Sequence, residues 1–96
     1  MKREDVILQL RRFKTENQER YTIVRLGLFG SGARDALTER SDVDVVVELG
    51  EPDLFHVIGI KQDLEDQLHV PVDVVRYRKN MNTFLKERID REAIYV

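Results

Sequence analysis

Two aspartates alternate with valines in the segment Ser41–Val47, and this alternation most constrains the fold. A run of β-branched residues favours a strand, and successive side chains of a strand point to opposite faces. Asp42 and Asp44 therefore share one face, with Cα atoms about 6.6 Å apart, while the valines occupy the other. A carboxylate within so apolar a strand is costly to bury unless something pairs with it. The segment predicts a sheet with a polar site on one face.

A second valine-rich segment, Val70–Val75, carries one more acid, Asp73. This segment also predicts a strand, and Asp73 then adds a third carboxylate to the face that holds Asp42 and Asp44. Mg²⁺ prefers hard oxygen ligands and completes its shell with water and substrate phosphates. Two metals about 3.5–4 Å apart can stabilise both oxygens of an in-line phosphoryl displacement. We expect the three acids to converge on metal, with Asp73 as ligand or base.

Each acid also has a simpler interpretation when taken alone. Asp42 suits a turn aspartate that accepts hydrogen bonds from backbone N–H groups. Asp44 and Asp73 suit ion pairs inside the sheet with Arg25 or Arg76, although buried pairs are weak evidence for stability. The three acids together with the neighbouring glycine-rich turn favour the metal site.

The glycine-rich turn, in the segment Leu28–Arg34, predicts a phosphate-binding site. Glycine at position 30 lets the backbone approach a phosphate closely. Ser31 offers a hydroxyl and a backbone N–H at the start of a short helix expected over residues 33–37, where anions bind well. Arg34 lies within reach of a phosphate oxygen. Gly30, Ser31 and Arg34 are therefore the candidate nucleotide-binding residues. A plain helix cap for Ser31 and a surface ion pair for Arg34 are the alternatives.

Hydrophobic periodicity predicts an α+β fold with α/β-type layering, in which helices flank a small mixed sheet of three to four strands. Helices are expected over residues 3–19, from the Asp53 cap to about 68, and over 83–91; strands are expected over 23–29, 42–49 and 70–75. The connection from Gly30 to Ser41 is too short for an ordinary parallel crossover. The first two strands are therefore expected to be antiparallel.

The second helix places five apolar residues on one stripe: Leu54, Val57, Ile58, Leu64 and Leu68. Phe55 lies off this stripe and is expected to be exposed. Lys61 lies near its centre and is expected to extend its amine to solvent. His56 and His69 have no metal-ligand spacing and are expected at the surface or at an edge.

Composition excludes several classes of function. The 96 residues fit one domain, expected over 1–96. The net charge of −2 argues against a nucleic-acid partner, and the absence of cysteine excludes disulfides and thiolate metal sites. No apolar run approaches the roughly 20 residues that span a bilayer, and no signal peptide is evident. We expect a cytoplasmic protein without a membrane partner.

Gly30-Ser31, ten intervening residues and then Asp42-Val43-Asp44 resemble the signature of the polymerase-β-type nucleotidyltransferase superfamily. The chain length and the residues of the segments Gly30–Arg34 and Ser41–Asp44 resemble its minimal nucleotidyltransferase branch (MNT, the MntA-like antitoxins). Members of this branch are often paired with a HEPN-domain toxin. The similarity runs from about residue 29 to 75 and continues more weakly in the last helix and tail. The resemblance implies the nucleotidyltransferase fold.

The resemblance also implies an activity. Asp42 and Asp44 would bind Mg²⁺, Asp73 would act as ligand or base, and the glycine-rich turn would bind the triphosphate of ATP or another NTP. A nucleotidyl group, AMP from ATP, would pass to a tyrosine of a HEPN-type toxin with release of pyrophosphate. One departure is Asp35, where the branch commonly has glycine. The alternative is a catalytically inactive antitoxin that neutralises its partner by surface contact.

Overall fold

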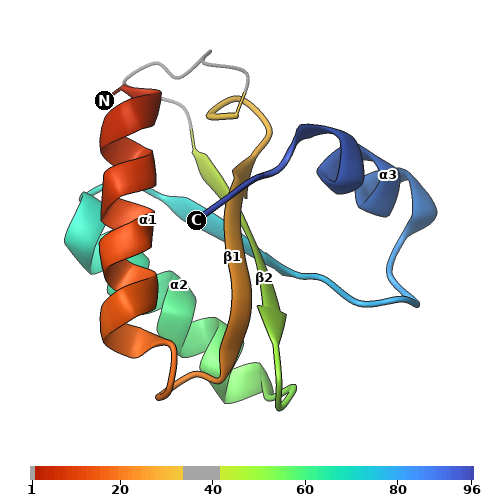
Figure 1. Ribbon diagram of the computed structural model, residues 1–96, viewed down its shortest axis with the longest axis horizontal. Coiled ribbons are helices and arrows are strands. Elements are labelled where there is room, and N and C mark those ends of the chain that lie inside the picture. The colour runs from red at the N-terminus through yellow and green to blue at the C-terminus, as the bar shows by residue number, and fades with distance from the viewer. Residues whose placement is uncertain (1, 34–41) are drawn as a thin grey trace.

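The computed structural model describes residues 2–33 and 42–96, which form a sheet covered by helices on both faces (Figure 1). The elements follow in the order α1 (Arg3–Asn17), β1 (Ile23–Phe29), β2 (Val43–Leu49), α2 (Leu54–Leu68), β3 (Val72–Arg76), α3 (Thr83–Glu92) and β4 (Ile94–Tyr95). Helices α1 and α2 cover one face, and α3 lies on the other (Figure 1). The predicted α+β layering is confirmed.

The sheet has the strand order β3-β2-β1-β4 and is mixed. Strand β1 is antiparallel to β2 and to β4, whereas β3 runs parallel to β2. The predicted antiparallel pairing of the first two strands is confirmed. The prediction was a sheet of three to four strands, and β4, formed by the C-terminal tail, is the fourth.

Each face of the sheet has its own apolar core. On one face the odd-numbered valines of β2 pack with buried residues of α1 and α2, among them Phe13, Ile60 and Leu64. On the other face Phe29 and Val46 pack against Ile89 of α3. Because both faces are covered, an acid of β2 reaches solvent only near the end of the strand.

The orientation of α2 differs from the prediction. Leu54 and Ile58 were expected on the apolar stripe but are 71% and 49% exposed, whereas Ile60 is fully buried. The helix carries more apolar residues than one face can bury, so packing against α1 and β3 selects the face. The prediction that Phe55 is exposed is confirmed.

Polar side chains begin α2 and α3. The carboxylate of Asp53 accepts from the N–H of Phe55, which confirms the predicted cap, and the Asn82 side chain accepts from the N–H of Leu85. His56 is half-buried, and its ring makes a T-shaped contact with the ring of Tyr21. Within residues 2–33 and 42–96, no helix has the length and apolarity needed to cross a bilayer.

Candidate nucleotidyltransferase site

Two of the three candidate acids face each other across neighbouring strands. Asp44 of β2 is the register partner of Asp73 of β3 in the parallel ladder, so their Cα atoms lie about 4.8 Å apart. Asp42 lies two residues before Asp44 and belongs to the same face. Asp44 is half-buried, whereas Asp42 and Asp73 are exposed. The structure thus places the three acids at one end of the sheet, on the face that α3 covers only in part.

Gly30 lies directly beside the Asp44 carboxylate. Gly30 has φ +68°, a left-handed conformation that L side chains rarely adopt. A Cβ added to this glycine would collide with Asp44 Oδ2. Glycine is therefore required at this position for two reasons: the backbone conformation of the turn, and the Asp44 carboxylate that occupies the space of a Cβ.

The turn after β1 is held by packing and by α1. A Cβ on Gly32 would approach Leu28 Cδ1 to 2.8 Å, so the turn lies tightly on the core. Arg3 Nη1 donates to the carbonyl oxygen of Ala33 at 3.4 Å and ties the turn to the first turn of α1. Ser31 is half-buried between these anchors. Arg34 and most of the short helix expected over 33–37 lie outside the described residues.

Neither arginine proposed as an ion-pair partner neutralises the candidate acids. Arg25 donates from Nε to Glu48 at 2.7 Å, and its guanidinium lies over the rings of Tyr95 and Tyr77 at 4.6 and 5.2 Å. The hydrogen bond with Glu48 is the main cause that raises the pKa of Arg25 above its usual value. Arg76 lies three residues after Asp73 on the opposite face of β3.

The acids suit a metal that binds together with the nucleotide rather than a three-ligand protein cage. Among residues 2–33 and 42–96, no three His, Cys, Asp or Glu side chains lie close enough to hold a metal ion by themselves. Asp42, Asp44 and Asp73 therefore do not form such a cage without further ligands. The carboxylates of Asp44 and Asp73 are hard oxygen donors, and Mg²⁺ is commonly held by one or two carboxylates plus substrate phosphates. In donor chemistry this pair fits Mg²⁺.

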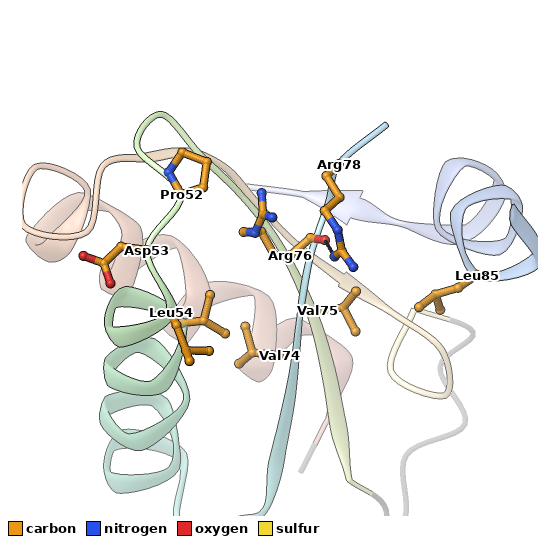
Figure 2. A pocket seen from close by; sticks show the side chains of 9 residues that line it. Pro52, Asp53, Leu54, Val74, Val75, Arg76, Arg78 and Leu85 are labelled. Carbon is orange, nitrogen blue, oxygen red and sulfur yellow. Dashed lines mark hydrogen bonds between the residues drawn. The ribbon is translucent and has the colours of Figure 1, made fainter. Parts of the chain in front are cut away.

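An open groove of about 570 Å³ lies along β3 from Val74 onward, toward the C-terminal end of the strand. Figure 2 shows Val74 and Val75 along its floor, with Leu54 of α2 and Leu85 of α3 on either side and Arg76 and Arg78 above. The groove contains none of the three candidate acids. Its lining also contains no residue of the glycine-rich turn.

Comparison with known proteins identifies the family. A family model described as "Nucleotidyltransferase domain" matches residues 10–96. The chain belongs to the nucleotidyltransferase domain family. The match covers the glycine-rich turn, all three acids and the strands that carry them. The fold and the family expected from the sequence are both confirmed.

Relatives of this nucleotidyltransferase cover nearly the same length. It is 34% identical over 84 residues to the protein adenylyltransferase MntA of Thermococcus cleftensis, covering 86% of this chain and 84% of that protein. It is 34% identical over 88 residues to MJ0126 of Methanocaldococcus jannaschii, a protein provisionally named a protein adenylyltransferase, covering 91% of this chain and 90% of the relative.

Solved structures show the same fold. A structure provisionally described as a minimal nucleotidyltransferase superposes with a TM-score of 0.81 at 34% identity and covers 98% of this chain and 95% of the other. A crystal structure of a toxin–antitoxin with AMP-PNP superposes with a TM-score of 0.76 at 20% identity, covering 92% of this chain and 69% of the other. The second likeness concerns the fold alone.

Proposed function

We propose that this nucleotidyltransferase transfers AMP from ATP to a tyrosine hydroxyl of a HEPN-type toxin and thereby acts as an antitoxin. Relatives that share about a third of its residues are named protein adenylyltransferases. A structure with the same fold is described as a tri-AMPylated HEPN toxin of Shewanella oneidensis in complex with an MNT antitoxin. These names support both the group that is transferred and the class of acceptor.

The observation that carries the proposal is the pairing of Asp44 with Asp73 beside the Gly30 turn. In the proposed site Asp42, Asp44 and Asp73 hold Mg²⁺ with the nucleotide, and the turn binds the triphosphate through backbone N–H groups and the Ser31 hydroxyl. When bound there, Mg²⁺ would neutralise the negative charge of the phosphates in the transition state. The proposal extends to Arg34 as a phosphate ligand.

The proposed transfer needs one proton acceptor and a fixed phosphate. The acceptor hydroxyl oxygen bonds to the α-phosphorus of ATP while the bond to the oxygen that bridges to the β-phosphate breaks, and pyrophosphate leaves. Asp73 receives the hydroxyl proton, because it is the exposed member of the paired acids. Gly30 and Ser31 hold the triphosphate so that the leaving oxygen lies opposite the attacking one.

Labelled nucleotide tests this proposal directly. The chain is co-expressed with a HEPN-type toxin, purified and incubated with ATP labelled on its α-phosphate and with Mg²⁺. We expect label on a toxin tyrosine, reduced at least about 100-fold by Asp42→Asn combined with Asp44→Asn. Asp66→Asn, at an exposed acid of α2, is the matched control. Absence of label, or label that survives the double substitution, contradicts the proposal.

Exposed aromatic side chains favour a second candidate, an inactive antitoxin that works by contact. Phe55 and Phe84 are 79% and 83% exposed, and large exposed apolar side chains are common at partner interfaces. In that case the Asp42→Asn, Asp44→Asn double variant neutralises the toxin as well as the unchanged protein does. Loss of neutralisation in the double variant selects the enzymatic proposal.

Two further expectations stay proposals. We propose that residues 1–96 form one domain, which the two apolar cores on a single sheet support. We also propose a cytoplasmic setting, where ATP and Mg²⁺ are available. A single cooperative unfolding transition tests the first proposal, and fractionation of the cells that make the protein tests the second.

A further inference from the structure

Two side chains of α2 hold both outward-facing backbone groups of Val72, the residue before Asp73. Lys61 Nζ donates to the Val72 carbonyl oxygen at 2.7 Å, and Glu65 Oε2 accepts from the Val72 N–H at 3.0 Å. Lys61 and Glu65 lie one helical turn apart, with Nζ and Oε2 separated by 3.8 Å. Both contacts with the strand are shorter than the ion pair, so the strand backbone is the main partner of each side chain.

Val72 lies at a position where the sheet has no further strand. The Pro71 carbonyl accepts from the N–H of Val43 at 3.1 Å, and the Tyr77 N–H donates to the Val47 carbonyl at 2.8 Å. The odd-numbered residues of this segment therefore direct their backbone groups toward β2. Because successive residues of a strand alternate, the groups of Val72 point outward, and β3 is the edge strand. Lys61 and Glu65 take the place of a missing neighbour.

The Lys61 contact restrains the backbone that carries Asp73. The Val72 carbonyl and the Asp73 N–H belong to one planar peptide unit. A hydrogen bond to the carbonyl oxygen therefore limits rotation of that unit and sets the direction in which the Asp73 side chain leaves the strand.

The Glu65 contact extends across the sheet to β2. The Val72 N–H shares its peptide unit with the Pro71 carbonyl, which in turn accepts from the N–H of Val43. Val43 lies between Asp42 and Asp44 in the sequence. The carbonyl of Glu65 also accepts from the N–H of His69, which ends α2 in a left-handed conformation. The backbone of Glu65 thus contacts the end of α2, while its side chain holds β3 at the residue whose neighbour, Pro71, is bonded to Val43.

We propose that Lys61 and Glu65 are positioning residues for nucleotidyl transfer, which fix the position of the Asp73 backbone relative to that of Asp44 on the neighbouring strand. The inference rests on the proposed function, because its catalytic part needs the transfer reaction. A misplacement of a reacting group by about 1 Å can lower a rate about 100-fold. A hydrogen-bonded clamp one residue from the acid limits such displacements at the open edge of the sheet.

Paired variants test the clamp with a readout that does not depend on activity. Glu65→Ala and Lys61→Met remove the two contacts, while Glu65→Gln keeps an acceptor and Lys61→Arg keeps donors. Glu16→Ala is the matched control, because Glu16 forms an i,i+4 pair with an arginine on α1 at 3.0 Å. Hydrogen exchange of individual amides is followed by NMR, and the transfer rate is measured against ATP concentration.

We expect Glu65→Ala to speed exchange of the Val72 amide about fivefold and Lys61→Met to speed exchange of the Asp73 amide. In both variants kcat falls about tenfold or more while KM for ATP stays within about twofold. Glu65→Gln and Lys61→Arg recover most of the rate. The control variant changes neither readout.

The proposal is overturned if Glu65→Ala and Glu16→Ala give the same exchange rates at Val72, or if exchange changes and kcat does not. Unfolding midpoints of all variants are compared, and the conservative variants keep the test valid where an alanine variant does not fold. If the unchanged protein transfers no nucleotide, the proposed function fails, while exchange at Val72 still decides whether the clamp exists.

Discussion

The carboxylate of Asp44 occupies the space beside Gly30 in which any other residue would carry its Cβ. The two residues come from neighbouring strands, since Gly30 directly follows Phe29, the register partner of Asp44. The glycine-rich turn and the acid of β2 are therefore a single packed unit. A side chain added at Gly30 must therefore displace the Asp44 carboxylate.

Gly30→Ala is predicted to damage both stability and transfer. An L residue at φ +68° is strained, and the added methyl group collides with Asp44, so the free energy of unfolding falls by about 1–2 kcal/mol. Transfer falls more than stability explains, because the displaced carboxylate is a proposed metal ligand. Urea unfolding and the labelled-ATP assay measure the two effects.

Gly50→Ala is the control for this prediction. A Cβ at Gly50 would have the Thr22 carbonyl oxygen as its nearest neighbour at 3.6 Å, which is ordinary contact, and Gly50 has no positive φ. It lies beyond the opposite end of β2. Equal losses of activity in the two alanine variants would contradict the role given to Gly30.

Local pattern was sufficient to predict the face that carries the acids. The alternation of aspartate with valine places Asp42 and Asp44 together whatever the strand pairs with, and the short link after Gly30 fixes β1 and β2 as antiparallel. The pairing of Asp44 with Asp73 was less accessible. The pairing depends on the register of the parallel ladder between β2 and β3. That register is set by which valines of the two strands are buried in the core. A shift of one residue would turn Asp73 to the opposite face of the sheet.

Asp73→Asn is predicted to stabilise the protein without metal while abolishing its response to ligand. Like charges directly opposite one another on adjacent strands are destabilising, so removal of one raises the free energy of unfolding by about 0.2–1 kcal/mol in EDTA. With Mg²⁺ and ATP the unchanged protein gains stability by mass action, and the variant does not. Thermal unfolding with and without Mg-ATP measures both.

The control for the Asp73 prediction is Asp66→Asn on α2. This variant should leave both the metal-free stability and the rise with Mg-ATP unchanged. High salt should shrink the gain of Asp73→Asn, because screening weakens the repulsion. A metal-free loss of stability in Asp73→Asn would show that the carboxylate is held by favourable contacts instead.

Tyr21 gives a prediction for alkaline pH. Its hydroxyl donates to Asp63 Oδ2 at 2.5 Å. Burial, with help from Asp63, raises the pKa of Tyr21 above its ordinary value of 10.0, while the guanidinium of Arg20 acts in the opposite direction. A raised pKa means that the folded state holds its proton more tightly, so this contribution to stability is complete below pH 10 and is lost as pH rises through the folded pKa.

The test of the Tyr21 linkage is Tyr21→Phe, which keeps the ring that packs on Phe13 and removes the hydroxyl. At pH 7 the variant should lose about 1 kcal/mol of unfolding free energy. Above pH 10 the difference between the two proteins should shrink, because only the tyrosine protein loses stability there through this group. Urea unfolding at several pH values measures it, and a difference that stays constant to high pH would contradict the linkage.

Residues that act through tertiary contact were missed by sequence reasoning. Lys61 was expected to extend into solvent, yet it donates to a strand carbonyl, and Glu65 carried no signal beyond its i,i+4 spacing from that lysine. The packing of His56 against Tyr21 was likewise not predicted. Such contacts depend on the distance between elements far apart in sequence, which local periodicity does not encode.

The rotation of α2 supplies the last prediction. Leu64 is fully buried and Leu54 is 71% exposed, although both were expected on one stripe. Leu64→Ala removes a side chain from the core between α2 and the sheet, so it should lower the free energy of unfolding by about 2–5 kcal/mol. Leu54→Ala should change it by no more than about 0.5 kcal/mol. Urea unfolding compares the two, and similar losses would mean that α2 buries the face first expected, which would also move Lys61 and Glu65 away from Val72.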